Sequence, residues 1–94
     1  MKEHRNTNNH LYFEFEKIKN NTYKEITNLV VKKFELSPEN ELVVGLDEIL
    51  QNFKSGEAII GLEWDIWSGY IVVAQNKESE SLATEVANYI NENN

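Results

Sequence analysis

The chain has 94 residues, of which 40% are hydrophobic and 11% aromatic, and it carries a formal net charge of -7. This length and composition predict one small globular domain. The absence of cysteine excludes disulfides, thiolate nucleophiles and cysteine metal sites, and it is compatible with a reducing compartment. No apolar run approaches the roughly 18 residues of a membrane-spanning helix, and the first residues are not followed by the apolar segment of a signal peptide. We therefore expect a soluble, cytoplasmic protein.

The charge is distributed unevenly along the chain. Residues 1–33 contain seven Lys or Arg and four acidic residues, whereas residues 34–94 contain two Lys and twelve acidic residues. Such a chain is expected either to present ordinary solvated surface, or to attract a basic protein or a second copy of itself. The excess of acids argues against binding to nucleic acid.

The first third of the chain predicts a strand and a helix. Residues 1–10 are polar and are expected to form a flexible leader, followed by a single domain of residues 11–94. The segment LYFEFEK alternates in the manner of a half-buried strand that directs Leu11, Phe13 and Phe15 toward the core. A helix is expected to follow from Thr22, because Thr22 and Glu25 have the spacing of a capping box, with apolar residues along one helical face.

Residues 37–56 fit two interpretations. In the first, one helix covers most of the segment and is interrupted by Gly45. In the second, residues 42–44 form a short strand and Asp47 caps a small helix. Both interpretations predict a helix that ends near Lys54.

The last third predicts a hairpin and a closing helix. AIIGLEWD and YIVVAQ are typical strands, and Gly69 in the turn between them supplies a positive φ. Asn76 then caps an amphipathic helix that extends to about Ile90. The order of elements predicts an α+β fold: an antiparallel sheet of three or four strands with helices packed on one face.

Aromatic and acidic residues crowd the hairpin and suggest a surface for a partner. Strand alternation places Glu63 and Asp65 together on the face opposite Trp64. If the first strand joins the same sheet with its Phe face inward, its glutamates emerge on that outer face too. Trp67 lies in the turn, where it either folds back over the sheet or contacts another molecule. The predicted partner-binding residues are Glu14, Glu16, Glu63, Asp65, Trp67 and Tyr70.

The sequence motifs of common enzyme classes are missing. The four glycines form neither a GxGxxG nor a Walker loop, and Ser68 is not in a GxSxG elbow. Acid and base catalysis by paired carboxylates needs a cleft, which a small open sheet does not provide. There is no DxDxDG calcium loop, and His4 and His10 lie in the expected leader. We therefore expect no enzyme activity, no cofactor and no metal.

Residues 61–90 carry a resemblance. GLEWDIWSGYIVVA followed by ESESLATEVANYI resembles a pattern in small uncharacterised bacterial proteins carried on mobile elements, including integron gene cassettes. The resemblance implies a bacterial origin and an accessory function. In size and charge the chain is also similar to immunity or anti-toxin proteins, which cover the active site of a partner.

Two functional hypotheses follow. The first is a non-enzymatic accessory protein that binds a basic protein through its acidic and aromatic surface, in the manner of an immunity protein or inhibitor. The alternative is a small-ligand binding protein with an apolar pocket between sheet and helices, lined by Phe13, Trp64 and Tyr89. Either protein is compatible with a homo-oligomer.

Overall fold

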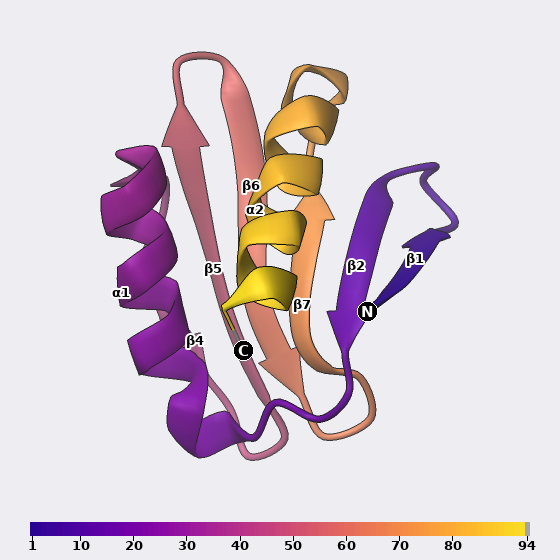
Figure 1. The fold of residues 1–94 in the computed structure, drawn as a ribbon, viewed down its shortest axis with the longest axis vertical. Coiled ribbons are helices and arrows are strands. Elements are labelled where there is room, and N and C mark those ends of the chain that lie inside the picture. Colours follow the sequence, from indigo (N-terminus) through magenta and orange to yellow (C-terminus); the bar gives the residue numbers. More distant parts are fainter. Residues whose placement is uncertain (94) are drawn as a thin grey trace.

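The computed structural model describes residues 1–93, in which two α-helices cover one face of a seven-stranded antiparallel sheet (Figure 1). The strand order is β1-β2-β7-β6-β5-β3, and β4 also pairs with β5. The strands are β1 (Lys2–Arg5), β2 (Leu11–Phe15), β3 (Ser37–Pro38), β4 (Val43–Val44), β5 (Glu48–Ser55), β6 (Ala58–Asp65) and β7 (Gly69–Ala74). The α-helices are α1 (Tyr23–Phe34) and α2 (Glu80–Glu92), preceded by the short 3-10 helices η1 (Asn20–Thr22) and η2 (Lys77–Ser79).

The α+β fold class is confirmed, but the sheet has more strands than the three or four expected. The additional strands are short or lack an apolar pattern. Strands β3 and β4 have two residues each and pair with opposite ends of β5. The short strand expected at residues 42–44 in one of the two interpretations is present as β4, whereas the two residues of β3 are too few to give a detectable periodicity.

The prediction of a helix that ends near Lys54 is wrong, because Glu48–Ser55 forms strand β5. Ile49 and Phe53 are four residues apart, a spacing that fits one face of a helix and also one face of a strand. The segment forms a strand rather than a helix because it pairs with β6 in a long hairpin. In this hairpin Glu48 pairs with Asp65 and Ser55 pairs with Ala58. Gly56, with φ of 60°, supplies the turn.

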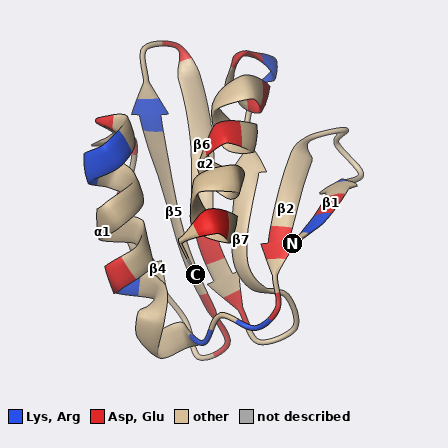
Figure 2. Ribbon diagram, viewed as in Figure 1, with Lys and Arg blue, Asp and Glu red and all other residues tan. Residues whose placement is uncertain are grey.

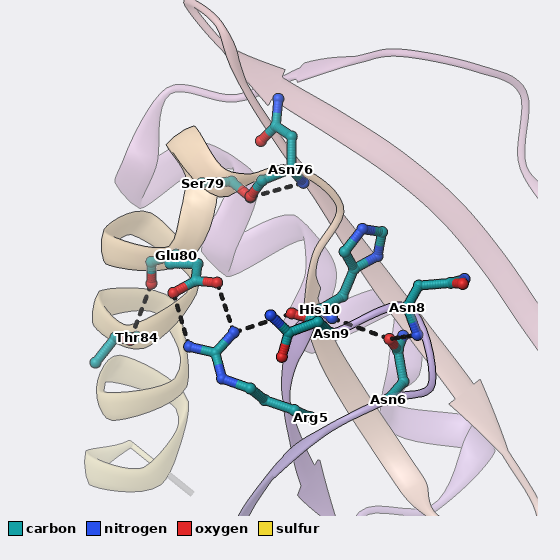
Figure 3. A network of polar contacts seen from close by, with 9 residues as sticks. All are labelled: Arg5, Asn6, Asn8, Asn9, His10, Asn76, Ser79, Glu80 and Thr84. Carbon is teal, nitrogen blue, oxygen red and sulfur yellow. Dashed lines mark hydrogen bonds and ion pairs between the residues drawn. The ribbon is translucent and has the colours of Figure 1, made fainter.

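Residues 1–10, expected to be a flexible leader, include strand β1, which pairs with β2 along its full length. Every residue of β1 is exposed, so no apolar burial holds it. Ion pairs attach it instead, among them a two-pronged contact between the Arg5 guanidinium and the Glu80 carboxylate on α2 (Figure 3). Contacts between residues so distant in sequence cannot be predicted from a local sequence pattern.

The core lies between the sheet and the two helices. As strand alternation predicts, Leu11, Phe13 and Phe15 of β2 are buried against the helices. Strands β6 and β7 contribute their helix-facing residues, and α2 contributes a narrow face that includes Val86 and Ile90. Figure 1 shows α2 across the middle of the sheet and α1 beside β5.

Helix α1 begins near the expected residue but without the expected capping box. The Thr22 hydroxyl donates to the carbonyl of Lys19 rather than accepting from the helix, because η1 precedes α1 directly. The helix buries Tyr23, Thr27 and Val30, while Leu29 is half exposed. The buried face of α1 therefore includes the Thr27 hydroxyl, which a pattern of apolar residues does not predict.

Candidate functional site

The face of the sheet opposite the helices carries the acids singled out by the sequence. Strand β7 separates β2 from β6, and Glu14, Ile71 and Glu63 lie side by side across these three strands. The first strand of the sequence prediction, β2, therefore lies in the same sheet as β6, and Glu14 and Glu63 share its outer face. An isoleucine lies between them, so the surface alternates apolar and acidic side chains.

The carboxylates of Glu14 in β2 and of Glu16, directly after β2, are paired with side chains of β1. The Lys2 ammonium lies 2.6 Å from the Glu16 carboxylate, and His4 Nε2 lies 2.9 Å from that of Glu14. The contact with Lys2 holds the pKa of Glu16 below its usual value. These two acids are consequently paired within the chain, unlike Glu63 and Asp65.

Tyr70 does not belong to a binding surface. Its side chain is fully buried on the helix-covered face, and its hydroxyl lies 2.7 Å from the Thr27 hydroxyl on α1. Burial raises the pKa of Tyr70 far above its ordinary value. The pairing of Tyr70 with Trp64 across the hairpin explains this placement, since directly opposed residues share a face.

Trp67 is 75% exposed, so the indole does not fold back over the sheet. Its backbone is nevertheless held in place. Asp65 Oδ1 accepts hydrogen bonds from the backbone N–H of Trp67 at 3.0 Å and of Ser68 at 2.6 Å. This Asx-type turn fixes the backbone from which the indole projects.

Residues that the sequence did not single out join Trp67 at this end of the sheet. The backbone N–H of Ile66 donates to the carbonyl of Asp47, which links the β6–β7 turn to the β4–β5 connection. Leu46 in that connection is fully exposed, and Ile66 is half exposed. We define the acidic tip as this cluster: Leu46, Asp47, Glu48, Glu63, Asp65, Ile66 and Trp67.

All the ionisable side chains of the acidic tip are acidic. Glu48 lies directly opposite Asp65 in the β5–β6 pairing, and Figure 2 shows acidic residues gathered where β5 begins and β6 ends. No Lys or Arg occurs between Lys33 and Lys54. On the helix-covered face, the Ile18 carbonyl in the β2–α1 connection accepts a hydrogen bond from the Trp64 indole N–H.

Within the acidic tip, the ionised form of Glu63 is disfavoured by its surroundings. Burial, reinforced by the charges of Asp65 and Glu48, raises its pKa from 4.5 to about 7. Gln75 extends across Gly61, and its amide Nε2 lies 3.2 Å from Asn52 Oδ1 and 3.5 Å from Glu63 Oε2. The side chain of any residue larger than glycine at position 61 would collide with Gln75 and Val73.

The three residues expected to line a ligand pocket do not surround one. Phe13 and Trp64 are buried members of the packed core, as strand alternation indicates for Trp64. Tyr89 packs edge-to-face against Phe34 and borders a small hollow of about 120 Å³ between α1 and α2. A larger apolar hollow lies elsewhere, between α1 and β5.

Within residues 1–93, no group of three or more His, Asp or Glu side chains is placed to hold a metal ion. Neither of the two helices described has the length and apolar character to cross a bilayer. Comparison of the chain with protein-family models, curated proteins and solved structures finds no match.

Proposed function

We propose that the protein is a non-enzymatic accessory protein of bacterial mobile elements that binds a basic protein, in the manner of an immunity protein or inhibitor. The acidic tip is the contact surface. The observation that carries the proposal is the presentation of Trp67, an exposed tryptophan whose backbone is fixed by Asp65 among unpaired carboxylates. The proposal moves the expected surface away from Glu14, Glu16 and Tyr70.

The apolar part of the acidic tip has the composition of a binding hot spot. Tryptophan is among the residues that most often dominate binding energy, especially when apolar neighbours surround it. Leu46 and Ile66 supply those neighbours. The exposed indole of Trp67 would gain apolar burial on binding.

The charge of the acidic tip determines the kind of partner. Asp47, Glu48, Glu63 and Asp65 are four acidic side chains, and none of them forms an ion pair within residues 1–93. A partner with Arg or Lys around an apolar recess would relieve their mutual repulsion and would be steered toward this end of the molecule. An acidic partner or a nucleic acid would be repelled.

The test is affinity capture from a lysate of the source organism, followed by titration of the purified partner with variants. We expect a basic partner whose affinity falls at least about tenfold with Trp67→Ser, since hot-spot residues contribute 2 kcal/mol or more. Raising the salt concentration should weaken capture. The matched control is Leu29→Ser, which removes an exposed apolar side chain from α1.

Three outcomes would contradict the proposal: an acidic partner, equal losses for Trp67→Ser and Leu29→Ser, or no specific partner at all. Light scattering separates partner binding from self-association. A mass above the 11.0 kDa of the monomer that returns to it with Trp67→Ser would show that the acidic tip contacts a second copy instead.

A further inference from the structure

A second surface feature lies on the other side of the sheet and has different chemistry. The hollow between α1 and β5 has a volume of about 470 Å³. Tyr23 and Val31 of α1 form one wall, Ile49 and Phe53 of β5 form the floor, and Leu42 and Val44 form the opposite wall. We call this hollow the α1–β5 groove.

The α1–β5 groove exists because the helices do not reach the edge of the sheet. Strands β3 and β4 extend the sheet beyond β5, and their connection remains outside the packed core. Leu42 is therefore 49% exposed and Val44 67% exposed, although both side chains border an apolar surface. Isolated apolar residues on a surface are ordinary, but these line one concavity.

One charged residue borders the α1–β5 groove. Lys24 lies on the first turn of α1, and no carboxylate within residues 1–93 forms an ion pair with its ammonium. The other polar lining groups include the amides of Asn20, Asn28 and Gln51. Small-molecule sites commonly combine a mostly apolar wall, a few polar groups and a volume of about 300–1,000 Å³.

We propose that the α1–β5 groove binds a small amphipathic anion, an acyl or aryl carboxylate. The apolar body of the ligand lies against Leu42, Val44 and Ile49, and its carboxylate lies at the ammonium of Lys24. The charge of Lys24 selects an anion over a cation, because the remaining lining groups are neutral. The volume of about 470 Å³ lies within the usual range of small-molecule sites.

This inference does not rest on the proposed function. The acidic tip is expected to bind a basic macromolecule, whereas the α1–β5 groove is expected to bind a small acid. Val44 and Leu42 line the groove without belonging to the acidic tip. Failure of either proposal therefore leaves the other unaffected.

The test is a titration of the full chain with decanoate and with 2-naphthoate, below their aggregation concentrations, followed by amide chemical-shift changes. We expect saturable binding of at least one acid, with shifts concentrated in residues 20–31 and 38–53. Decyltrimethylammonium has the same chain with the opposite charge and is expected to bind at least about fivefold more weakly. Thermal unfolding should shift upward with the bound acid, since the ligand binds the folded state.

Two variants locate the site. Lys24→Gln should weaken binding of the acid about fivefold, and Val44→Glu should weaken it about tenfold by placing a carboxylate on the groove wall. Val44 is exposed, so its replacement should leave the fold intact, which the amide spectrum verifies. Lys33→Gln, in the last turn of α1, is the matched control and should bind the acid as the wild type does.

The proposal is overturned if neither acid binds saturably, if the cation binds as tightly as decanoate, or if both variants retain full affinity. Shifts centred on Ile66 and Trp67 would also overturn it, because they would place the ligand on the acidic tip.

Discussion

The carboxylate of Asp65 accepts the backbone N–H of Trp67, so an acid on the outer face of the sheet determines how an exposed tryptophan is presented. A change of Asp65 to lysine would therefore alter both charge and turn. Two milder variants separate these roles. Asp65→Asn retains the oxygen acceptor and should keep the turn, whereas Asp65→Ala removes it and should lower the free energy of unfolding by about 1 kcal/mol.

The two variants also predict different effects on partner binding. Asp65→Asn should weaken binding only through the loss of one charge, and this difference from the wild type should vanish at high salt. Asp65→Ala should weaken it at all salt concentrations, because the backbone at Trp67 is then no longer fixed. Equal affinities of the two variants at high salt would show that the turn contributes nothing to recognition.

Thr27 and Tyr70 form a buried hydroxyl pair between α1 and β7. Tyr70→Phe removes one hydroxyl and leaves that of Thr27 without this partner, so we expect a loss of about 1–3 kcal/mol in the free energy of unfolding. Thr27→Val alone should cost a similar amount. The double variant should cost less than the sum of the two, which a double-mutant cycle by urea unfolding measures. Strict additivity would show that the two hydroxyls do not interact.

The placement of Tyr70 shows what sequence periodicity leaves open. Both faces of β7 are apolar, since Ile71 and Val73 alternate with Tyr70 and Val72. Alternation alone cannot decide which set faces the helices. The decision comes from the hairpin register, in which Trp64 opposes Tyr70, a signal that the short turn makes available.

The same reasoning explains which other parts of the molecule were predictable. Strands β2 and β6 and both helices have apolar faces of the right period, β7 is a continuous apolar run, and the outward direction of Glu63 follows from alternation. Strand β5 was not predictable from spacing, because its apolar residues also match a helix. Because these residues were interpreted as a helix, the position of Glu48 opposite Asp65 could not be predicted. The assembly of the acidic tip from two hairpin turns could not be predicted for the same reason.

Strand β1 should be less protected than the strands that contribute to the core, β2, β5, β6 and β7. It buries no side chain and depends on pairs such as Arg5 with Glu80, at 2.8 and 2.9 Å (Figure 3). Arg5→Gln should accelerate amide hydrogen exchange in residues 2–5 and 11–15 with little effect on β6, because local opening need not unfold the core. High salt should act in the same direction on the wild type. Uniform acceleration over the whole sheet would instead place β1 in the cooperative core.

Glu63 should make stability depend on pH. Its pKa is raised from 4.5 to about 7, so between these values the folded protein holds a proton that the unfolded chain has released. The free energy of unfolding should therefore fall as pH rises from 4.5 to 8, by at most about 3 kcal/mol from this group. Glu63→Gln should remove this part of the fall and be more stable than wild type at pH 8. Urea unfolding of both proteins at pH 5 and pH 8 measures the difference, and parallel changes in the two proteins would contradict it.

The same proton links pH to recognition. A partner cation placed beside Glu63 favours the ionised carboxylate and lowers its pKa in the complex, so binding releases a proton wherever the free carboxyl is still protonated. Affinity should accordingly increase as pH rises from 6 to 8 and level off above the pKa of the free protein. Glu63→Gln should bind more weakly at pH 8 and lose most of this pH dependence, while Glu85→Gln on the exposed side of α2 should retain it. Calorimetric titrations in buffers of different ionisation enthalpy report the proton release directly. A wild-type affinity that is constant from pH 6 to 8 would remove Glu63 from the contact surface and leave Trp67 with Asp65 as its centre.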